Sequence, residues 1–207
     1  MPKTLSAADV AQFRARLCAV AQHRFARHGP DAVTMRQLAD ALGCSPMTPY
    51  RYFRNKNDIL AAVRAAAFDR FAAAMERATR STPQDPVAMS GAVGDAYIRF
   101  AFDEPDAYRL MFDLSQPHPE RYPELVRATA RARATMSVPF KALVNAGIVS
   151  GDPEHLGYIF WGMMHGLIML DFAGKLPATP GFSTLQREAR RMLVAAARAA
   201  RGGRRRP

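Results

Sequence analysis

The stretch of sequence that decides the fold is TMRQLADALGCSPMTPYRYFRNKNDIL, residues 34–60. Thr34 is followed three residues later by Gln37, which is the spacing of a capping box and predicts the start of a short helix. Gly43 ends that helix, and a second short helix is expected almost at once, at about residues 46–52. Two short helices joined by a tight turn are typical of a helix-turn-helix, whose second helix enters the major groove of DNA.

The side chains around this second helix suit a polyanionic partner. Arg51 can donate two hydrogen bonds to guanine or to a phosphate, and Met47 and Thr48 can contact a thymine methyl group. Tyrosine hydroxyls and the free N–H groups at the start of the following helix can reach phosphate oxygens. The residues that this chemistry nominates for DNA contact are Arg36, Gln37, Ser45, Met47, Thr48, Tyr50, Arg51, Tyr52 and Lys56.

The charge distribution supports the same interpretation. The 207 residues carry a net charge of +11 and a pI near 10.5, which predicts an anionic partner: nucleic acid, an anionic membrane or an acidic protein. Residues 1–60 account for +5 and residues 198–207 for another +5.

The longest apolar run, residues 157–170, is shorter than the roughly 20 residues that a spanning helix needs. Two cysteines are too few for a disulfide framework, so a cytoplasmic location is expected.

The rest of the chain is patterned for helices as well. Apolar residues recur at helical spacing, and no stretch shows clean two-residue alternation or a hairpin signal. The expected fold class is all-α. About nine helices are expected, at about residues 8–28, 34–42, 46–52, 55–80, 86–102, a short one after 104–105, 122–147, 153–173 and 183–200.

The string LADALGCSPMTPYRYFRNKNDIL, residues 38–60, resembles the DNA-binding signature of the TetR family of transcriptional regulators. The positions that carry the resemblance are Thr34, Ala39, Gly43, Ser45, Tyr50, Tyr52, Phe53, Lys56 and Leu60. Pro49 stands where many members carry an aliphatic residue, and it removes one early backbone hydrogen bond. Carried over by position, the resemblance implies DNA contacts from Thr34, Arg36, Gln37, Ser45, Thr48, Tyr50, Tyr52 and Lys56.

The resemblance also implies a domain organisation and an assembly. It predicts a three-helix head, residues 8–54, linked through a helix at 56–80 to a larger helical body at 84–200 that binds a ligand and forms a homodimer. The last seven residues, 201–207, are expected to be an unstructured basic tail.

Two segments of the body resemble one C-terminal subgroup of the family, marked by a Trp…His-Gly (WHG-like) pattern. They are WGMMHGL, residues 161–167, and YRLMF, residues 108–112. Methionine and aromatic side chains suit a cavity for varied apolar molecules, although any one of them is more often simple core packing. The candidate ligand-binding residues are Phe100, Tyr108, Met111, Phe112, Phe140, Trp161, Met164 and His165.

The last two expected helices carry apolar seams. One seam follows a near-heptad spacing with glycines beside it, and the other is rich in small residues. Packing within one chain explains such seams, whereas the resemblance implies a four-helix dimer interface built from two helices of each protomer. The candidate interface residues are Leu156, Phe160, Met163, Leu167, Leu185, Met192 and Ala196.

The sequence contains no glycine-rich phosphate loop, HExxH motif or nucleophile motif, so the protein is not expected to be an enzyme. Its histidines lack metal-site spacing, and neither a metal nor another cofactor is expected. The favoured function is a ligand-responsive regulator, a repressor that binds a palindromic double-stranded operator as a dimer and is released by a small apolar or aromatic effector. The alternative is a helical carrier or sensor of small molecules without a DNA role.

Overall fold

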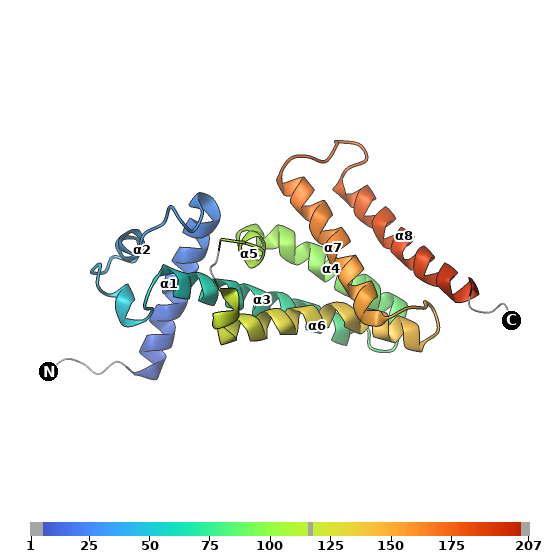
Figure 1. Cartoon of the computed structure of the whole chain (residues 1–207), viewed down its shortest axis with the longest axis horizontal. Helices are drawn as coiled ribbons and strands as arrows, with labels where there is room; N and C mark the ends of the chain where they lie inside the picture. The colour runs from blue at the N-terminus through green and yellow to red at the C-terminus, as the bar shows by residue number, and fades with distance from the viewer. Residues whose placement is uncertain (1–5, 116–117, 204–207) are drawn as a thin grey trace. The chain divides into compact units, whose positions relative to one another are not determined.

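The computed structural model describes residues 6–115 and 118–203, and every element of regular secondary structure in these parts is a helix, as the sequence predicts. Two 3-10 turns accompany eight α-helices in these parts (Figure 1). The α-helices are α1 (Ala7–His28), α2 (Met35–Ala41), α3 (Lys56–Ser81), α4 (Pro86–Asp103), α5 (Pro105–Met111), α6 (Pro123–Asn145), α7 (Pro153–Phe172) and α8 (Phe182–Gly203). The 3-10 turns are η1 (Pro49–Arg51) and η2 (Pro119–Arg121).

The chain divides into two compact units. The first consists of Met1–Arg70 and Asp103–Arg131, and the second of Phe71–Phe102 and Ala132–Pro207. The N-terminal unit is larger than the head predicted at 8–54, because α5 packs on α1 and contributes Leu110 to the same core. The boundary between the units runs through α3 and α6 rather than through a loop.

The core of the first unit is assembled from α1, α2, α3 and α5, together with Val33 and Phe53 of the segments that join the first three helices. The buried apolar side chains that form it are Leu17, Ala21, Phe25, Val33, Met35, Leu38, Phe53, Ile59, Leu60, Val63 and Leu110. The i, i+4, i+8 spacing of Leu17, Ala21 and Phe25 puts them on one face of α1, and all three are fully or almost fully buried. Gly29, at φ 79°, ends α1 with an N–H that donates to the Phe25 carbonyl oxygen.

An aromatic cluster organises the second unit. Phe71 makes edge-to-face contacts with Tyr97 and Phe100 of α4, with ring centroids 5.2 and 5.3 Å apart. Phe160 of α7 links this group to Phe140 of α6, at 6.1 Å from Tyr97 and 6.0 Å from Phe140. Such pairs are worth about 0.5–1.5 kcal/mol beyond the area they bury.

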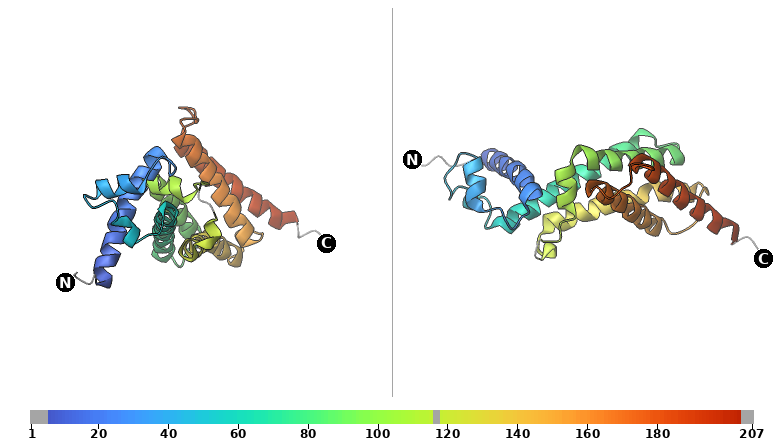
Figure 2. Two further views of the ribbon diagram at one scale, coloured as in Figure 1. Left: turned by 60° about the vertical axis from the view of Figure 1, so that its left-hand side comes forward. Right: turned by 90° about the horizontal axis from the view of Figure 1, so that it is seen from above.

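α7 and α8 lie side by side and run in opposite directions (Figures 1 and 2). Asp152 caps α7 with a carboxylate that accepts from the N–H groups of Glu154 and His155, which confirms the predicted start. The last helix, α8, begins at Phe182, one residue before the predicted start at 183. α8 continues to Gly203 and so includes the first three residues of the expected tail, whereas residues 204–207 lie outside the described part.

Across the described residues, no helix is both long enough and apolar enough to cross a membrane.

Candidate nucleic-acid interface

The capping box predicted at the start of α2 is present. The Thr34 hydroxyl accepts from the Gln37 N–H at 3.2 Å, and the Gln37 side-chain oxygen accepts from the Thr34 N–H at 2.8 Å. These two bonds satisfy backbone donors that the helix itself leaves without partners. α2 then buries Met35, Leu38 and Ala39 while Thr34 and Gln37 stay at the surface.

The segment after α2, residues 45–52, which we call the reading turn, is not the α-helix expected at 46–52. It contains the 3-10 turn η1, in which the Arg51 N–H donates to the Thr48 carbonyl oxygen at 3.1 Å and the Tyr52 N–H to the Pro49 carbonyl oxygen at 3.0 Å. A separate turn precedes it, in which the Thr48 N–H donates to the Ser45 carbonyl oxygen at 2.8 Å. The physical reason is Pro49, which has no N–H to donate to Ser45 and therefore cannot continue an α-helical ladder. The reading turn therefore lies where the second helix of the motif is predicted, but its backbone forms a 3-10 turn instead of an α-helix.

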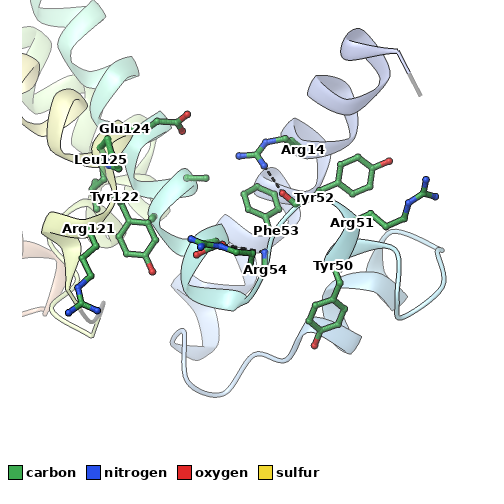
Figure 3. Close-up of a pocket in the computed structure, with 14 residues that line it drawn as sticks. Arg14, Tyr50, Arg51, Tyr52, Phe53, Arg54, Arg121, Tyr122, Glu124 and Leu125 are labelled. Carbon is green, nitrogen blue, oxygen red and sulfur yellow. Dashed lines mark hydrogen bonds and ion pairs between the residues drawn. The ribbon is translucent and has the colours of Figure 1, made fainter. Parts of the chain in front are cut away.

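Three contacts hold the reading turn against α1. The Arg14 guanidinium donates to the Tyr52 carbonyl oxygen at 2.6 Å and lies 4.0 Å from the ring centroid of Phe53. The ring of Phe13 stacks on that of Tyr52, with centroids 4.2 Å apart. Figure 3 shows Arg14 directed at the Tyr52 carbonyl, while Tyr50 and Arg51 project outward. Sequence reasoning missed Arg14, because its partners are more than thirty residues away and only the fold brings them together.

The start of α3 is built around its own cap. The Asn55 side-chain oxygen accepts from the Asp58 N–H at 2.9 Å, and the Asp58 carboxylate pairs with Arg54 at 3.0 Å. The Lys56 ammonium donates to the Asp31 carbonyl oxygen at 3.2 Å, so this side chain links α3 to the loop before α2. The Asp58 N–H, one of the donors expected to bind a phosphate, is therefore already bonded to Asn55. Lys56 contributes a positive charge and also a hydrogen bond to the loop before α2.

None of the ten residues predicted to contact DNA is buried. Met47 is 68% exposed and Tyr50 48% exposed, so both side chains are accessible to a partner. Thr48, Tyr52 and Lys56 are half-buried, and the other five, Thr34, Arg36, Gln37, Ser45 and Arg51, are exposed. The reading turn and the start of α2 therefore present a polar and cationic surface.

A groove of about 570 Å³ lies beside the reading turn within the first unit (Figure 3). It runs from Arg14 and the end of the reading turn to residues 121–125, around η2 and the start of α6. Four arginines line it, Arg14, Arg51, Arg54 and Arg121, with two carboxylates, Asp58 and Glu124. Its wall extends the cationic character of the reading turn.

The eight predicted ligand-binding residues do not line one cavity. Tyr108 and Met111 are buried in the first unit, where Phe112 packs 5.2 Å from Tyr108, so these three lie in a different unit from the other five. Phe100 and Met164 are buried in the second unit. Trp161 lines a recess of about 10 Å³, which is too small for an effector. His165 is half-buried, and burial lowers its pKa.

Phe140 is the one residue of the eight that lines a pocket of about 590 Å³ in the second unit, between α4, α6, α7 and α8. The pocket could not be read from the sequence, because it depends on how four helices pack. None of the α8 residues predicted for the dimer interface lines this pocket.

The predicted interface residues fall into two groups. Leu156 and Phe160 are buried within their own unit, so they face its core, and the expectation that they form an interface is corrected. Met163, Leu167 and Leu185 are half-buried, whereas Met192 is 70% exposed and Ala196 is exposed. The outward face of α7 carries other apolar residues instead: Tyr158, Ile159, Met169 and Leu170 are exposed.

No cluster of histidine, cysteine or carboxylate side chains within residues 6–115 and 118–203 has the arrangement of a metal site. Burial raises the pKa of the Cys18 thiol to about 11, an effect that Arg14 opposes and Glu124 reinforces.

These features define a helix-turn-helix protein. A capped short helix is followed by a tight turn and by an exposed segment that carries an arginine, and all three are held on a helical core. Two family models match the chain: "Bacterial regulatory proteins, tetR family" over residues 17–63, and "Tetracyclin repressor-like, C-terminal domain" over residues 91–197. The chain belongs to the TetR family of DNA-binding transcriptional regulators, which are not enzymes. The C-terminal match is described as tetracyclin repressor-like, and membership of the WHG-like subgroup stays a prediction.

Solved structures show the same fold. A protein with unknown function from Rhodococcus sp. RHA1 superposes with a TM-score of 0.75 at 22% identity, covering 96% of this chain and 99% of that one. The TetR-family regulator PfmR from Thermus thermophilus gives 0.69 at 21% identity, covering 86% and 97%. SmeT, the repressor of the Stenotrophomonas maltophilia efflux pump SmeDEF, gives 0.65 at 20% identity, covering 88% and 89%. A comparison with curated protein sequences finds no match.

Proposed function

We propose that this protein is a ligand-responsive repressor that binds a palindromic operator as a homodimer. The observation that carries the proposal is the reading turn, which is exposed and anchored to α1 by Arg14 and the Phe13–Tyr52 stack. A rigid support under an exposed cationic segment is what base recognition needs, because the contacting side chains must hold one register on the duplex. SmeT, which has the same fold and is a repressor, supports repression rather than activation.

In this proposal the ten predicted contacts divide by role. Arg51, exposed on η1, reads a base, and Met47 and Thr48 contact a thymine methyl group. The other seven hold the phosphate backbone: Thr34, Arg36, Gln37, Ser45, Tyr50, Tyr52 and Lys56. A dimer would place its two reading turns in successive major grooves about 34–36 Å apart, so the operator should be roughly palindromic.

The test begins with selection of a binding sequence from random DNA, followed by fluorescence anisotropy on that sequence and on a scrambled duplex. Arg51→Ala should reduce the preference for the selected sequence, since each good base contact contributes about 1–3 kcal/mol of discrimination. Tyr50→Phe, which removes only a hydroxyl from the same turn, should weaken binding to both duplexes alike. Failure to enrich any sequence, or an affinity that does not fall with salt, would refute operator binding.

The proposed dimer uses the outward faces of α7 and α8. On α7, exposed Tyr158 and Ile159 adjoin Gly162, where an added Cβ would meet no atom within 4 Å of its own chain. On α8, Met192 and Ala196 are exposed one turn apart. Large exposed apolar patches on a protein mark interaction surfaces, and glycine allows two helices to approach closely.

Gly162→Leu tests this interface, because Gly162 is exposed and a Cβ added there would meet no other atom of the protomer within 4 Å. We expect the variant to keep its helix content and to sediment as a monomer at concentrations where the unmodified protein is a dimer. Ala134→Leu, an equivalent enlargement at an exposed position of α6, is the matched control and should remain dimeric. A dimeric Gly162→Leu protein, or a monomeric parent, would rule out this surface.

A further inference from the structure

The pocket of the second unit is bounded by four helices. Its volume is about 590 Å³, within the 300–1,000 Å³ that is ordinary for small-molecule sites. The lining is mostly apolar, and the side chains that supply it are Val87 of α4, Phe140 and Leu143 of α6, Ile148 after α6, Phe160 of α7, and Leu193, Val194 and Ala195 of α8. One end is fixed where the Ser150 N–H donates to the Ala197 carbonyl oxygen at 2.9 Å.

The charges at the pocket have a single sign. Arg190, Arg191 and Arg198 line it, and no aspartate or glutamate does. The Arg190 guanidinium is committed to α4, where it pairs with Asp95 at 2.7 Å and donates to the Gly91 carbonyl oxygen at 3.2 Å. Arg191 and Arg198 are exposed, and neither forms an ion pair with another residue in the described part of the chain.

The two available arginines are placed around an apolar strip. Positions 191, 194, 195 and 198 follow the i, i+3, i+4, i+7 spacing of one helix face, so Val194 and Ala195 lie between the cations. This face of α8 therefore offers apolar contact in its middle and a guanidinium on either side. Guanidinium groups bind carboxylates, sulfonates and phosphates through paired N–H donors.

We propose that the pocket between α4, α6, α7 and α8 takes an apolar molecule that carries an acid group. The apolar body lies against Phe140, Leu143 and Val194, and the acid group is held by Arg191 or Arg198. Arg190 serves as part of the wall, because its ion pair with Asp95 already offsets its charge. The inference rests on the proposed function in one respect: the molecule acts as the effector of the regulator.

A matched pair of fluorescent probes tests the charge requirement directly. 8-Anilinonaphthalene-1-sulfonate and N-phenyl-1-naphthylamine share one ring system, and only the first has an acid group. Titrated into the protein without DNA, the sulfonate should bind up to roughly fivefold more tightly than the neutral probe, which corresponds to the upper value of about 1 kcal/mol for one exposed ion pair. Equal affinities would overturn the proposal.

Variants then locate the interaction. The double variant Arg191→Gln, Arg198→Gln should lose the preference for the sulfonate and keep its affinity for the neutral probe. Arg187→Gln, at an exposed α8 position that does not line the pocket, removes one cation elsewhere and should change neither. Val194→Trp should exclude both probes by filling the pocket. A preference that survives the double variant, or that falls as much in Arg187→Gln, would overturn the proposal, and thermal melting confirms that each variant is folded.

The effector role is tested by measuring whether the probe releases DNA from the complex of protein and operator. The sulfonate probe should release the selected DNA from the unmodified protein and not from the double variant. Correct probe binding without any release would overturn the effector role and leave the pocket chemistry standing. If the protein binds no DNA at all, the proposed function fails, and the probe titrations still decide the pocket chemistry because they use no DNA.

Discussion

Replacement of Arg14 by methionine removes the guanidinium that ties the reading turn to α1. We expect the free energy of unfolding to fall by about 2 kcal/mol. A hydrogen bond to a charged group contributes about 1.5–3 kcal/mol, and a cation–π contact at an accessible site about 0.5–1 kcal/mol. Both involve this one side chain, through the Tyr52 carbonyl at 2.6 Å and the Phe53 ring at 4.0 Å. Water can replace the arginine at the half-buried carbonyl, so the lower part of the summed range applies.

Urea unfolding followed by circular dichroism measures the change, and Arg16→Met is its control. Arg16 is exposed on the same helix, so its replacement removes the same charge without removing the anchor. Both variants should weaken binding to random DNA to a similar degree, whereas operator affinity should fall further in Arg14→Met. The reasoning is refuted if Arg14→Met is as stable as Arg16→Met and binds the operator equally well.

Three further predictions concern single side chains. Thr34→Ala should lower the free energy of unfolding by about 1 kcal/mol in urea titrations, because it removes the acceptor for the Gln37 N–H, and a change within error would mean that the cap contributes nothing. In a Cys44→Ser background, Cys18 should react slowly with iodoacetamide at neutral pH and faster as the pH approaches its pKa of about 11, since burial disfavours the thiolate; rapid reaction at neutral pH would contradict this. Burial also lowers the pKa of His165, so protonation favours the unfolded state and stability should fall as the pH drops below about 6.5; His165→Gln should reduce that fall in urea midpoints, and identical pH profiles would show that another group is responsible.

Local signals in the sequence predicted most helix ends correctly. The capping box at Thr34 and Gln37 and the helix starts predicted at residues 55 and 153 depend on residues within about one helical turn, so the local sequence is enough to predict them. The sequence also predicts an exposed segment after α2, but as an α-helix at about 46–52. Pro49 lies inside that segment and has no N–H to close the first α-helical turn, so the segment contains a 3-10 turn instead.

Features that depend on distant packing were not predictable from spacing alone. An apolar seam does not say which side of the helix meets its own core, so Leu156 and Phe160 were assigned to an interface although they are buried inside the unit. The anchoring role of Arg14 and the pocket with its α8 arginines arise from residues far apart in the chain. Aromatic residues nominated for a ligand site proved to belong to two separate units.

The measurement that tests the central claim most directly is methylation interference on the selected operator. If the reading turns of a dimer enter the major groove, methyl groups on guanine N7 should block binding in two patches about one helical turn apart. Arg51→Ala should lose the interference at one guanine in each patch and keep the rest. A single patch, or binding that is indifferent to major-groove methylation, would contradict the account.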